Sequence, residues 1–293
     1  EVAVIEMGIS DFGEMSRLAK MVRPTMAVYT LIGHAHLERL HDRNGVLKAK
    51  TEMLDYMPDD GTVFLNGDDD LLAGYQCKQN RVIYGRNDNA DVKAENISID
   101  GVKSISCDVV CGDRRFRVSV PAYGQHMVSA ALEGAAVGIK MGLTDEEIIN
   151  GISHYETVGR RANISDTGFV TLVDDCYNAN PDSVKCGIDS LKVLSGRKVC
   201  ILGDMLEMGE EKERIHRSIG EYAAKNGIGL LLTVGELSAN TSKGAVGIEA
   251  KHFDTNSELI EKLPKLLRKG DTVLVKASNY MRFDEISEAI KRL

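Results

Sequence analysis

The 293-residue chain is long enough for two domains, and its 43% of apolar residues can form sizeable buried cores. The formal net charge of −8 argues against a nucleic acid or an acidic membrane as partner, although a small anionic ligand can still bind at a local site of opposite sign. Tryptophan is absent and aromatic residues make up only 5% of the chain, so platforms that stack on bases are not expected.

Strands and helices alternate in the first part of the chain. Residues 12–22 carry apolar side chains at helical spacing, Asp11 and Glu14 are spaced like a capping box, and Pro24 ends the helix. A second helix carries Lys50. The strands predicted here from apolar runs are residues 2–8 (VAVIEMG), 26–32 (MAVYTLI) and 61–66 (GTVFLN).

The pattern changes to a period of two between about residue 80 and residue 120, which predicts a small antiparallel lobe. A helix over residues 126–142 follows and ends at Gly142, and Thr144 with Glu147 caps the next helix. Together with the preceding strands this predicts an N-terminally truncated domain over residues 1–160.

The alternation restarts after residue 160 and predicts a complete doubly wound, Rossmann-like α/β domain over residues 161–293. The expected strands are residues 169–175, 198–204, 230–235, 251–253 and 271–278, and the expected helices are residues 181–194, 210–227, 257–268 and 283–293. The fold class is therefore α/β in both domains.

Cysteine usage and hydropathy favour a cytoplasmic protein. The six cysteines form no C-x-x-C pair and no zinc-ligand spacing, so we expect reduced, structural thiols. No apolar run approaches the ~20 residues of a membrane span, so no membrane partner is expected. The chain begins in an apolar run and without a methionine, so we expect it to be a fragment of a longer protein. We also expect that protein to be a monomer.

Polar side chains stand where the predicted strands end, and open parallel sheets bind ligands beyond those ends. Two such clusters, one in each domain, would suit a ligand that bridges the domains. The alternative is that these side chains only cap the following helices. The strand-end residues are Glu6 and His36 in the first domain and Asp174, Asp175, Asp204 and Lys276 in the second.

The stretch IGHAHLERLHD contains His34, His36 and His41. An H-x-H pair near a strand end can be a metal pair, but only one of these histidines needs to face the cleft. The acids at residues 68–70 fit a turn and a helix start better than a set of ligands.

Lys50 points through the apolar stripe of its predicted helix, whereas Lys48 and Glu52 lie on the polar face and are spaced as an i,i+4 pair. Desolvation would lower the pKa of the Lys50 amine and make it nucleophilic. The alternative is a lysine whose stem is buried and whose ammonium reaches a carboxylate.

Two nucleotide-binding patterns are absent from the sequence. No G-x-G-x-x-G follows a predicted strand, and no G-x-x-x-x-G-K-[ST] phosphate loop occurs anywhere. Without that loop the chain by itself is not expected to hydrolyse a nucleoside triphosphate.

Seven segments nevertheless resemble the Mur ligases, in the family's order and over nearly the whole chain. They are EMGISDFGEM, IGHAHLE with GVLKAKTEML, GTVFLNGDD, ADVKAENI, VGRRANI, DDCYNANPDSV, and LGDMLEMGEE with a later histidine. The resemblance implies an enzyme that phosphorylates a carboxylate with ATP and lets an amine attack the acyl phosphate. DDCYNANPDS and LGDMLEMG are most similar to the ligases that add D-alanyl-D-alanine to UDP-MurNAc-tripeptide in peptidoglycan synthesis.

The resemblance also implies roles for individual residues. Glu6 and His36 would bind Mg²⁺ together with Lys50, which matches a carbamylated lysine of the family. A carbamate would turn the neutral amine into an anionic ligand, which explains a lysine beside a cation site. The residues implied in ATP binding or in shaping the site are Arg160 (phosphates), Asp175 (ribose), Tyr177, Asn178, Asn180 and His126.

One departure affects the nucleotide site. The family pattern H-N-x-x-N-A-L reads HMVSAAL here, so Met127 and Ala130 replace two asparagines expected near adenine. Two other functions stay open at this point: a different amino-acid ligase of the same superfamily, and a non-catalytic binding module that has lost its phosphate loop.

Overall fold

The computed structural model describes residues 1–101, 104–157 and 159–293, which form two compact units, Glu1–Tyr155 (unit 1) and Glu156–Leu293 (unit 2). Val102 and Lys103 of the predicted antiparallel run and Val158 of the segment VGRRANI lie outside the described residues. The structure groups residues 156–160 with unit 2, whereas the sequence placed them in the first domain.

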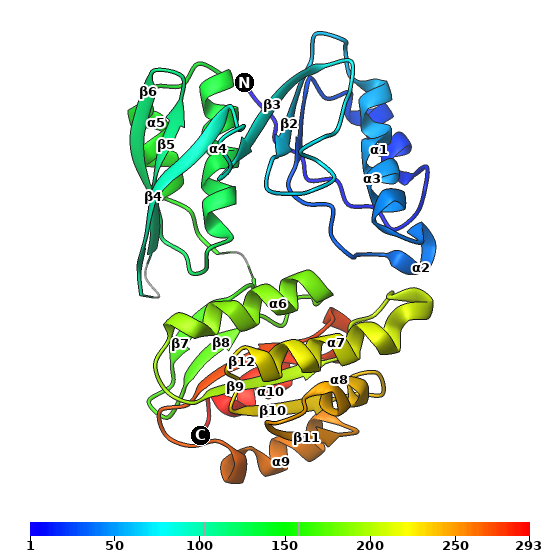
Figure 1. Cartoon of the computed structure of the whole chain (residues 1–293), viewed down its shortest axis with the longest axis vertical. Coiled ribbons are helices and arrows are strands. Elements are labelled where there is room, and N and C mark those ends of the chain that lie inside the picture. The colour runs from blue at the N-terminus through cyan, green and yellow to red at the C-terminus, as the bar shows by residue number, and fades with distance from the viewer. Residues whose placement is uncertain (102–103, 158) are drawn as a thin grey trace. The chain divides into compact units, whose positions relative to one another are not determined.

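Unit 1 is built on a single six-stranded sheet with the order β1-β2-β3-β4-β5-β6 (Figure 1). Strands β1 to β4 pair in parallel, and β4 to β6 pair antiparallel, so the predicted antiparallel lobe is an extension of the parallel sheet. The strands are β1 (Met26–Tyr29), β2 (Thr62–Asn66), β3 (Asn80–Gly85), β4 (Val92–Asp100), β5 (Ser104–Cys111) and β6 (Arg114–Val120).

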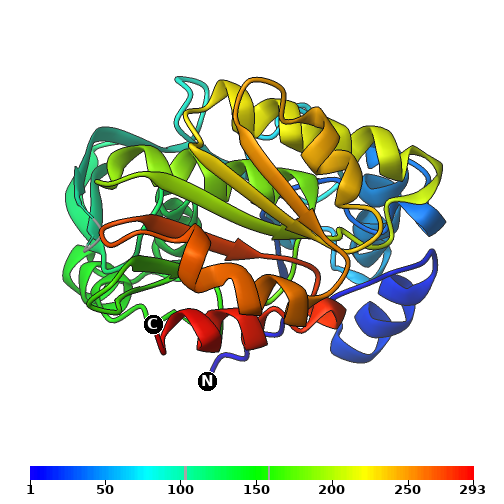
Figure 2. The ribbon, with the colours of Figure 1, turned by 90° about the horizontal axis from the view of Figure 1, so that it is seen from below.

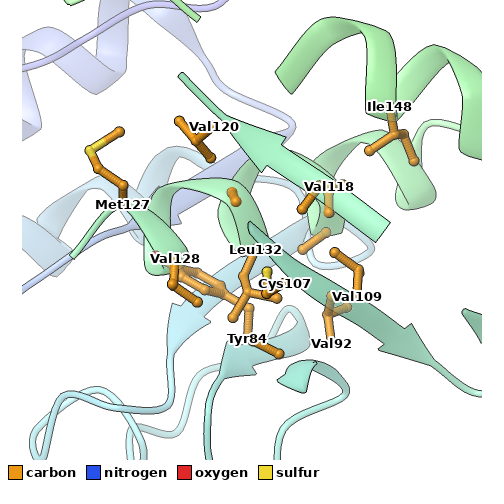
Figure 3. Packing of buried hydrophobic residues seen from close by; sticks show 14 of the residues in the cluster. Tyr84, Val92, Cys107, Val109, Val118, Val120, Met127, Val128, Leu132 and Ile148 are labelled. Carbon is orange, nitrogen blue, oxygen red and sulfur yellow. The ribbon is translucent and has the colours of Figure 1, made fainter. Parts of the chain in front are cut away.

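Two apolar clusters hold the helices of unit 1 on this sheet. Side chains of α4 such as Leu132 pack against Cys107 of β5 and Val118 of β6 (Figure 3). Ala19 of α1 and Ala49 of α3 belong to a second cluster with residues of β1 and β2. The helices are α1 (Glu14–Val22), α2 (Leu37–Leu40), α3 (Arg43–Thr51), the 3-10 helix η1 (Glu52–Tyr56), α4 (Met127–Lys140) and α5 (Asp145–Ser153).

The first predicted strand is wrong in this structure. Residues 2–8 pair with no strand among the described residues, and Val2, Val4 and Ile5 are 66%, 94% and 54% exposed. Their composition is that of a buried parallel strand, but such a strand needs neighbours that satisfy its backbone groups. In the described part of the chain, β1 pairs only with β2, so no neighbour is available.

The helix ends were predicted with mixed success. Thr144 and Glu147 form the expected reciprocal capping box of α5, and Gly142 after α4 has the left-handed φ of +81°. At α1 the Asp11 half of the predicted box is wrong, because the N-cap is Gly13 without a side-chain bond. Only the Glu14 half behaves as predicted: its carboxylate accepts the backbone N–H of Asp11 at 3.2 Å, and also that of Ser10 at 2.7 Å.

Unit 2 has a second six-stranded sheet, with the order β11-β10-β9-β12-β8-β7. All pairs are parallel except β7 with β8, and β7 was not predicted. The strands are β7 (Asn163–Asp166), β8 (Thr171–Asp174), β9 (Lys198–Gly203), β10 (Leu230–Val234), β11 (Glu249–Phe253) and β12 (Thr272–Lys276).

Helices cover both faces of this sheet, as the doubly wound prediction requires (Figure 2). The apolar cluster on one face contains side chains of α6 and α7, and the cluster on the other face contains those of α9 and α10. The helices are α6 (Pro181–Ser190), α7 (Lys212–Lys225), α8 (Ala239–Gly244), α9 (Asn256–Leu266) and α10 (Asp284–Ile290), of which α8 was not predicted. No helix in the described residues is long and apolar enough to cross a membrane.

His216 of α7 holds the loop that follows β9. Its ring is fully buried, with Nδ1 2.7 Å from the carbonyl oxygen of Lys212 and Nε2 2.9 Å from the backbone nitrogen of Met205. A carbonyl oxygen can only accept, so Nδ1 carries the proton and Nε2 accepts from the Met205 N–H. The ring is therefore neutral, and burial lowers its pKa below the usual value of 6.5.

We expect unit 2 to fold alone, because it has its own sheet and its own apolar clusters on both faces. A polypeptide spanning residues 156–293 should unfold in one cooperative transition when monitored by circular dichroism in urea. A gradual, non-cooperative loss of signal in this polypeptide, alongside a cooperative transition in the whole chain, would show that the unit depends on the rest of the chain.

The buried His216 should make stability depend on pH. Its folded pKa lies below the unfolded value of about 6.5, so its contribution is complete above pH 6.5 and is lost as the pH falls toward the folded pKa. The free energy of unfolding should therefore fall between pH 7 and pH 5, by at most about 1.4 kcal/mol per pH unit from this group. In His216→Gln this part of the slope should vanish, and in His252→Gln, the other histidine of unit 2, it should remain; equal slopes in the parent and His216→Gln would contradict the assignment.

Candidate active site

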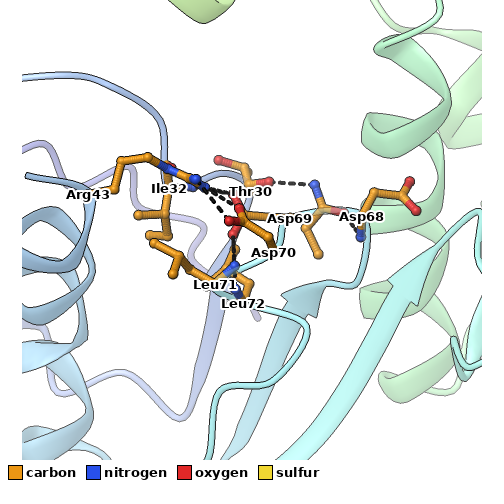
Figure 4. A network of polar contacts seen from close by, with 9 residues as sticks. Thr30, Ile32, Arg43, Asp68, Asp69, Asp70, Leu71 and Leu72 are labelled. Carbon is orange, nitrogen blue, oxygen red and sulfur yellow. Dashed lines mark hydrogen bonds and ion pairs between the residues drawn. The ribbon is translucent and has the colours of Figure 1, made fainter.

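The carboxyl end of β1 is held by a network centred on the buried Asp69 (Figure 4). Its carboxylate accepts the backbone N–H of Ile32 at 2.9 Å and those of Leu71 and Leu72 at 3.0 and 2.9 Å. The Arg43 guanidinium donates to the Ile32 carbonyl at 2.7 Å and pairs with Asp70. The acids at residues 68–70 are thus turn residues, as predicted, although no helix starts there.

The segment that follows this network contains two histidines with unusual backbone angles. His36 and His41, on either side of the four-residue helix α2, have φ values of 55° and 68°. Residues other than glycine rarely adopt such angles, and when they do they cluster at functional sites. His36 is therefore held in a defined conformation just beyond β1, where the sequence placed it.

Lys50 is half-buried on α3, between the buried residues Ala49 and Met53. Desolvation lowers the pKa of its amine, and the nearby Glu6 carboxylate acts in the opposite direction. Among the described residues the amine makes no hydrogen bond or ion pair, so the alternative of a lysine that reaches a carboxylate is not observed. The Glu6 carboxylate is near enough to influence the pKa of Lys50, but the two predicted metal ligands form no ion pair among the described residues.

The polar face of the same helix differs from the prediction. Lys48 lies with Nζ 5.8 Å from the centroid of the Phe12 ring. Glu52 does not pair with it, because both Glu52 oxygens accept the N–H of Gly13 at 3.0 Å and one accepts the Ser16 hydroxyl at 3.0 Å. The predicted Lys48–Glu52 pair is therefore wrong, since a backbone N–H at the start of α1 offers the carboxylate a better partner.

In unit 2 the topology itself marks a site at the end of β12. The helices that follow β8 and β9 lie on one face of the sheet, and the helix that follows β12, between them, lies on the other. The connections therefore diverge on both sides of β12, which is where open α/β sheets bind ligands. The residues at this edge are Asp174 at the end of β8, Asp175 after β8, Asp204 after β9 and Lys276 at the end of β12.

Asp174 and Asp175 are both paired. Asp174 accepts from Arg160 at 2.6 Å and from the Cys176 thiol at 3.0 Å. Burial raises the pKa of Cys176 to about 12, so this thiol is a hydrogen-bond donor and not a nucleophile. Asp175 pairs with Lys276 at 2.7 Å and accepts the backbone N–H of Ala162 at 3.1 Å.

Arg160 is held by a second carboxylate that the sequence did not indicate. Its guanidinium donates to Glu288 of α10 at 2.8 Å, and the bonds to Glu288 and Asp174 raise its pKa above the usual value. Glu288 and Arg160 are 128 positions apart in the chain, so no local pattern could have predicted this pair.

The loop after β8 contains the remaining predicted residues of unit 2. Tyr177 is 46% exposed and its ring lies 4.2 Å from the guanidinium carbon of Arg161. The Asn178 carbonyl accepts from Lys276 at 2.9 Å. Asn180 forms a reciprocal capping box with Ser183 at the start of α6, so its side chain caps a helix.

His126 directly precedes α4 in unit 1. The two positions where the family pattern has asparagines, Met127 and Ala130, line an apolar cavity of about 310 Å³ between α4 and α5. Among the described residues, no group of three or more His, Cys, Asp and Glu side chains is placed to hold a metal ion. The predicted metal site therefore depends on Lys50 becoming an anionic ligand.

Comparison with known proteins identifies the family to which the chain belongs. Residues 1–138 match the Mur ligase middle domain, and residues 159–279 match the Mur ligase C-terminal or glutamate ligase domain. The chain belongs to the Mur ligase family. The two matched segments fall in unit 1 and unit 2, respectively, so the family assignment covers both units.

Named members of the family show which ligases the chain resembles. The chain is 31% identical over 295 residues to the UDP-N-acetylmuramoyl-tripeptide–D-alanyl-D-alanine ligase of Bacillus subtilis, covering 98% of this chain and 63% of that protein. A crystal structure of MurF from Acinetobacter baumannii superposes with a TM-score of 0.91 at 24% identity, covering 99% of this chain and 64% of that one, which shows the shared fold.

A second solved structure carries a nucleotide. MurF from Thermotoga maritima, solved in complex with ADP, has a TM-score of 0.82 at 25% identity and covers 97% of this chain and 65% of that one. The chain thus spans just under two thirds of the length of the Mur ligases that it matches.

We expect Lys50 to form a carbamate with dissolved CO₂, because its amine is desolvated and makes no hydrogen bond in the described structure. The lone pair of the neutral amine forms the N–C bond while one C–O π bond of CO₂ opens onto its oxygen, an N–H proton is released to solvent, and an anionic carbamate results. With ¹³C-bicarbonate, the ¹³C NMR spectrum of the chain should show a carbamate signal that Lys50→Met removes and Lys48→Met retains. A signal that survives in Lys50→Met would assign the carbamate to another lysine.

Proposed function

We propose that the protein acts as the ATP-dependent ligase that joins D-alanyl-D-alanine to UDP-MurNAc-tripeptide. The observation that carries the proposal is the similarity to relatives of that name, which runs through both units and covers 98% of this chain in Bacillus subtilis and 99% in Escherichia coli. Because the chain covers 63% and 65% of those proteins, the proposal concerns the complete gene product.

The proposed chemistry would account for the polar residues at the strand ends of both units. A carboxylate resists attack by an amine because its charge repels the nucleophile and oxide is a very poor leaving group. Transfer of the γ-phosphoryl group of ATP to the tripeptide carboxylate breaks the β–γ anhydride bond and gives an acyl phosphate and ADP. The free amino group of D-alanyl-D-alanine then attacks the acyl carbon, phosphate leaves, and the amide forms.

The residues of unit 1 fit a magnesium site. Glu6, His36 and a carbamylated Lys50 would hold Mg²⁺, whose charge would offset the crowding of phosphate and carboxylate oxygens. The fit rests on Lys50, since a cationic lysine would oppose the metal, whereas this amine has a lowered pKa and lies near Glu6. The Asp69 network at Ile32 and the left-handed backbone of His36 would keep His36 in place before substrate arrives.

In unit 2 the proposed nucleotide contacts come from Arg160 and Asp175. Arg160 would bind ATP phosphates after its bond to the half-exposed Glu288 breaks, while the buried Asp174 would keep its bond to Arg160. Asp175 would accept a ribose hydroxyl with lone pairs that Lys276 and Ala162 leave free. Tyr177 and Asn178 would shape the adjoining surface of unit 2. In unit 1, the family resemblance assigns His126 a role in nucleotide binding.

The proposed compartment is the cytoplasm, where free thiols such as the six cysteines of this chain stay reduced. We propose a monomer, with small-molecule substrates as its partners. A membrane or a nucleic acid is not part of the proposal.

The test is release of phosphate from ATP by the complete gene product, supplied with UDP-MurNAc-tripeptide and a series of acceptor amines. Release should depend on D-alanyl-D-alanine, and single amino acids should not replace it. Release with another amino acid, or none with any acceptor, would refute the assigned acceptor or the enzyme itself.

Matched lysine variants sharpen this assay. Lys50→Ala should lower the rate by about 10²- to 10³-fold or more, as removal of preorganised charge stabilisation does, whereas the exposed Lys48→Ala should stay within about twofold of the parent. Short carboxylic acids should restore part of the Lys50→Ala activity by occupying the position of the carbamate. Near-normal turnover in Lys50→Ala would contradict its role.

A further inference from the structure

Lys276 is a buried lysine whose partners all belong to one loop. It is the last residue of β12 and is 2% exposed. Its ammonium lies 2.7 Å from Asp175 Oδ2, 2.9 Å from the Asn178 carbonyl oxygen and 3.4 Å from the Asp175 carbonyl oxygen. A charge is buried at high cost unless it is paired and hydrogen-bonded, so the loop after β8 is constrained to bring these three oxygens to β12.

Asp175 also holds a second segment of the chain, the backbone at Ala162. While Oδ2 faces Lys276, Oδ1 accepts the backbone N–H of Ala162 at 3.1 Å. Ala162 has a φ of 51°, a left-handed conformation that is unfavourable for a residue with a Cβ. Such a conformation persists only where the surroundings impose it, and here the bond to Asp175 does so.

Further bonds place residues 160–162 on the same loop. The Tyr177 N–H donates to the Arg160 carbonyl at 3.1 Å, and the guanidinium of Arg161 stacks on the Tyr177 ring. Asn279, three residues after Lys276, donates to the Tyr177 carbonyl at 3.1 Å. The end of β12 therefore anchors both the loop and the backbone that carries Arg160.

A second ion pair lies at the other end of the strands of this sheet, where the strands begin. Arg197, before β9, donates to both oxygens of Asp271, before β12, at 3.0 and 2.7 Å, and the Asp271 side chain is 3% exposed. This pair joins two connections at the amino ends of the strands, where none of the proposed ligand residues lies. Each pair has one deeply buried partner, Lys276 in the first and Asp271 in the second, and the pairs differ in what they hold.

We propose that Lys276 is a positioning residue: it fixes the loop 175–180 and, through Asp175, residues 160–162, so that Arg160 and Tyr177 are presented at the nucleotide side of unit 2. The positioning follows from the contacts of Lys276, and only the identity of the ligand rests on the proposed function. Lys276 itself needs no contact with the nucleotide, because its donors are directed to protein oxygens.

The test compares Lys276→Met with Arg197→Met in the whole chain. Both variants remove one partner of a buried pair, so both should lower the unfolding temperature. Hydrogen exchange of the Ala162 and Tyr177 amides should become about 10- to 100-fold faster in Lys276→Met, the loss that follows from losing a hydrogen bond to a charged group, and should change little in Arg197→Met. Equal acceleration in the two variants would reduce Lys276 to a stabilising residue and overturn the proposal.

A double variant keeps the test informative if Lys276→Met does not fold. Lys276→Met with Asp175→Asn removes both buried charges, so stability should recover. Exchange at the Ala162 and Tyr177 amides should stay fast, because the carbonyls of residues 175 and 178 still lack the ammonium. Exchange rates that return to those of the parent would show that the loop is positioned without Lys276.

Measuring ADP binding distinguishes a failure of the positioning role of Lys276 from a failure of the proposed nucleotide site. The Kd of the chain for ADP, measured by calorimetry, should rise by about tenfold or more in Lys276→Met, as small misplacements of binding groups do, and should stay within about twofold in Arg197→Met. If the parent does not bind ADP while the exchange results are as expected, the proposed nucleotide site fails and the positioning role of Lys276 stands. If ADP binds equally to the parent and to a folded Lys276 variant, the positioning role is refuted.

Discussion

Both units depend on one constraint: the polar groups at the carboxyl end of a buried parallel strand must find partners away from water. In unit 1 the buried Asp69 meets this need by accepting the N–H groups of Ile32, Leu71 and Leu72. In unit 2 Asp174 and Asp175 meet it through Arg160, Lys276 and the backbone of Ala162. The same carboxylates that satisfy the strand ends also hold the loops in which the ligand residues lie.

Two lysines show how burial leads to different roles. Lys50 is half-buried, forms no hydrogen bond among the described residues and has a lowered pKa, which suits an amine that reacts. Lys276 is more deeply buried, yet three oxygens surround its ammonium, which suits a cation that supports other residues. Burial alone therefore does not mark a reactive lysine; the absence or presence of compensating oxygens does.

The comparison with the sequence prediction separates local from non-local information. Helix ends with local signals, such as Thr144 with Glu147, were predicted correctly, because both partners lie within one turn. Glu52 was assigned to Lys48 on the same helix, yet it accepts from Gly13 and Ser16 across 39 and 36 positions of the chain. Residues 2–8 have the composition of a buried strand, but pairing needs a neighbour that the described residues do not provide.

By itself, the sequence determined the α/β class, nearly all the strands and helices of unit 2, and the residue types at the strand ends, because periodicity and chain order carry that information. The family resemblance supplied the roles proposed for Glu6, His36 and Lys50. Only the tertiary structure decided which partners these residues have. Glu288 on Arg160, Lys276 on Asp175 and the left-handed Ala162 result from contacts between distant segments, and such contacts arise only when the sheet has brought its strand ends to a common edge.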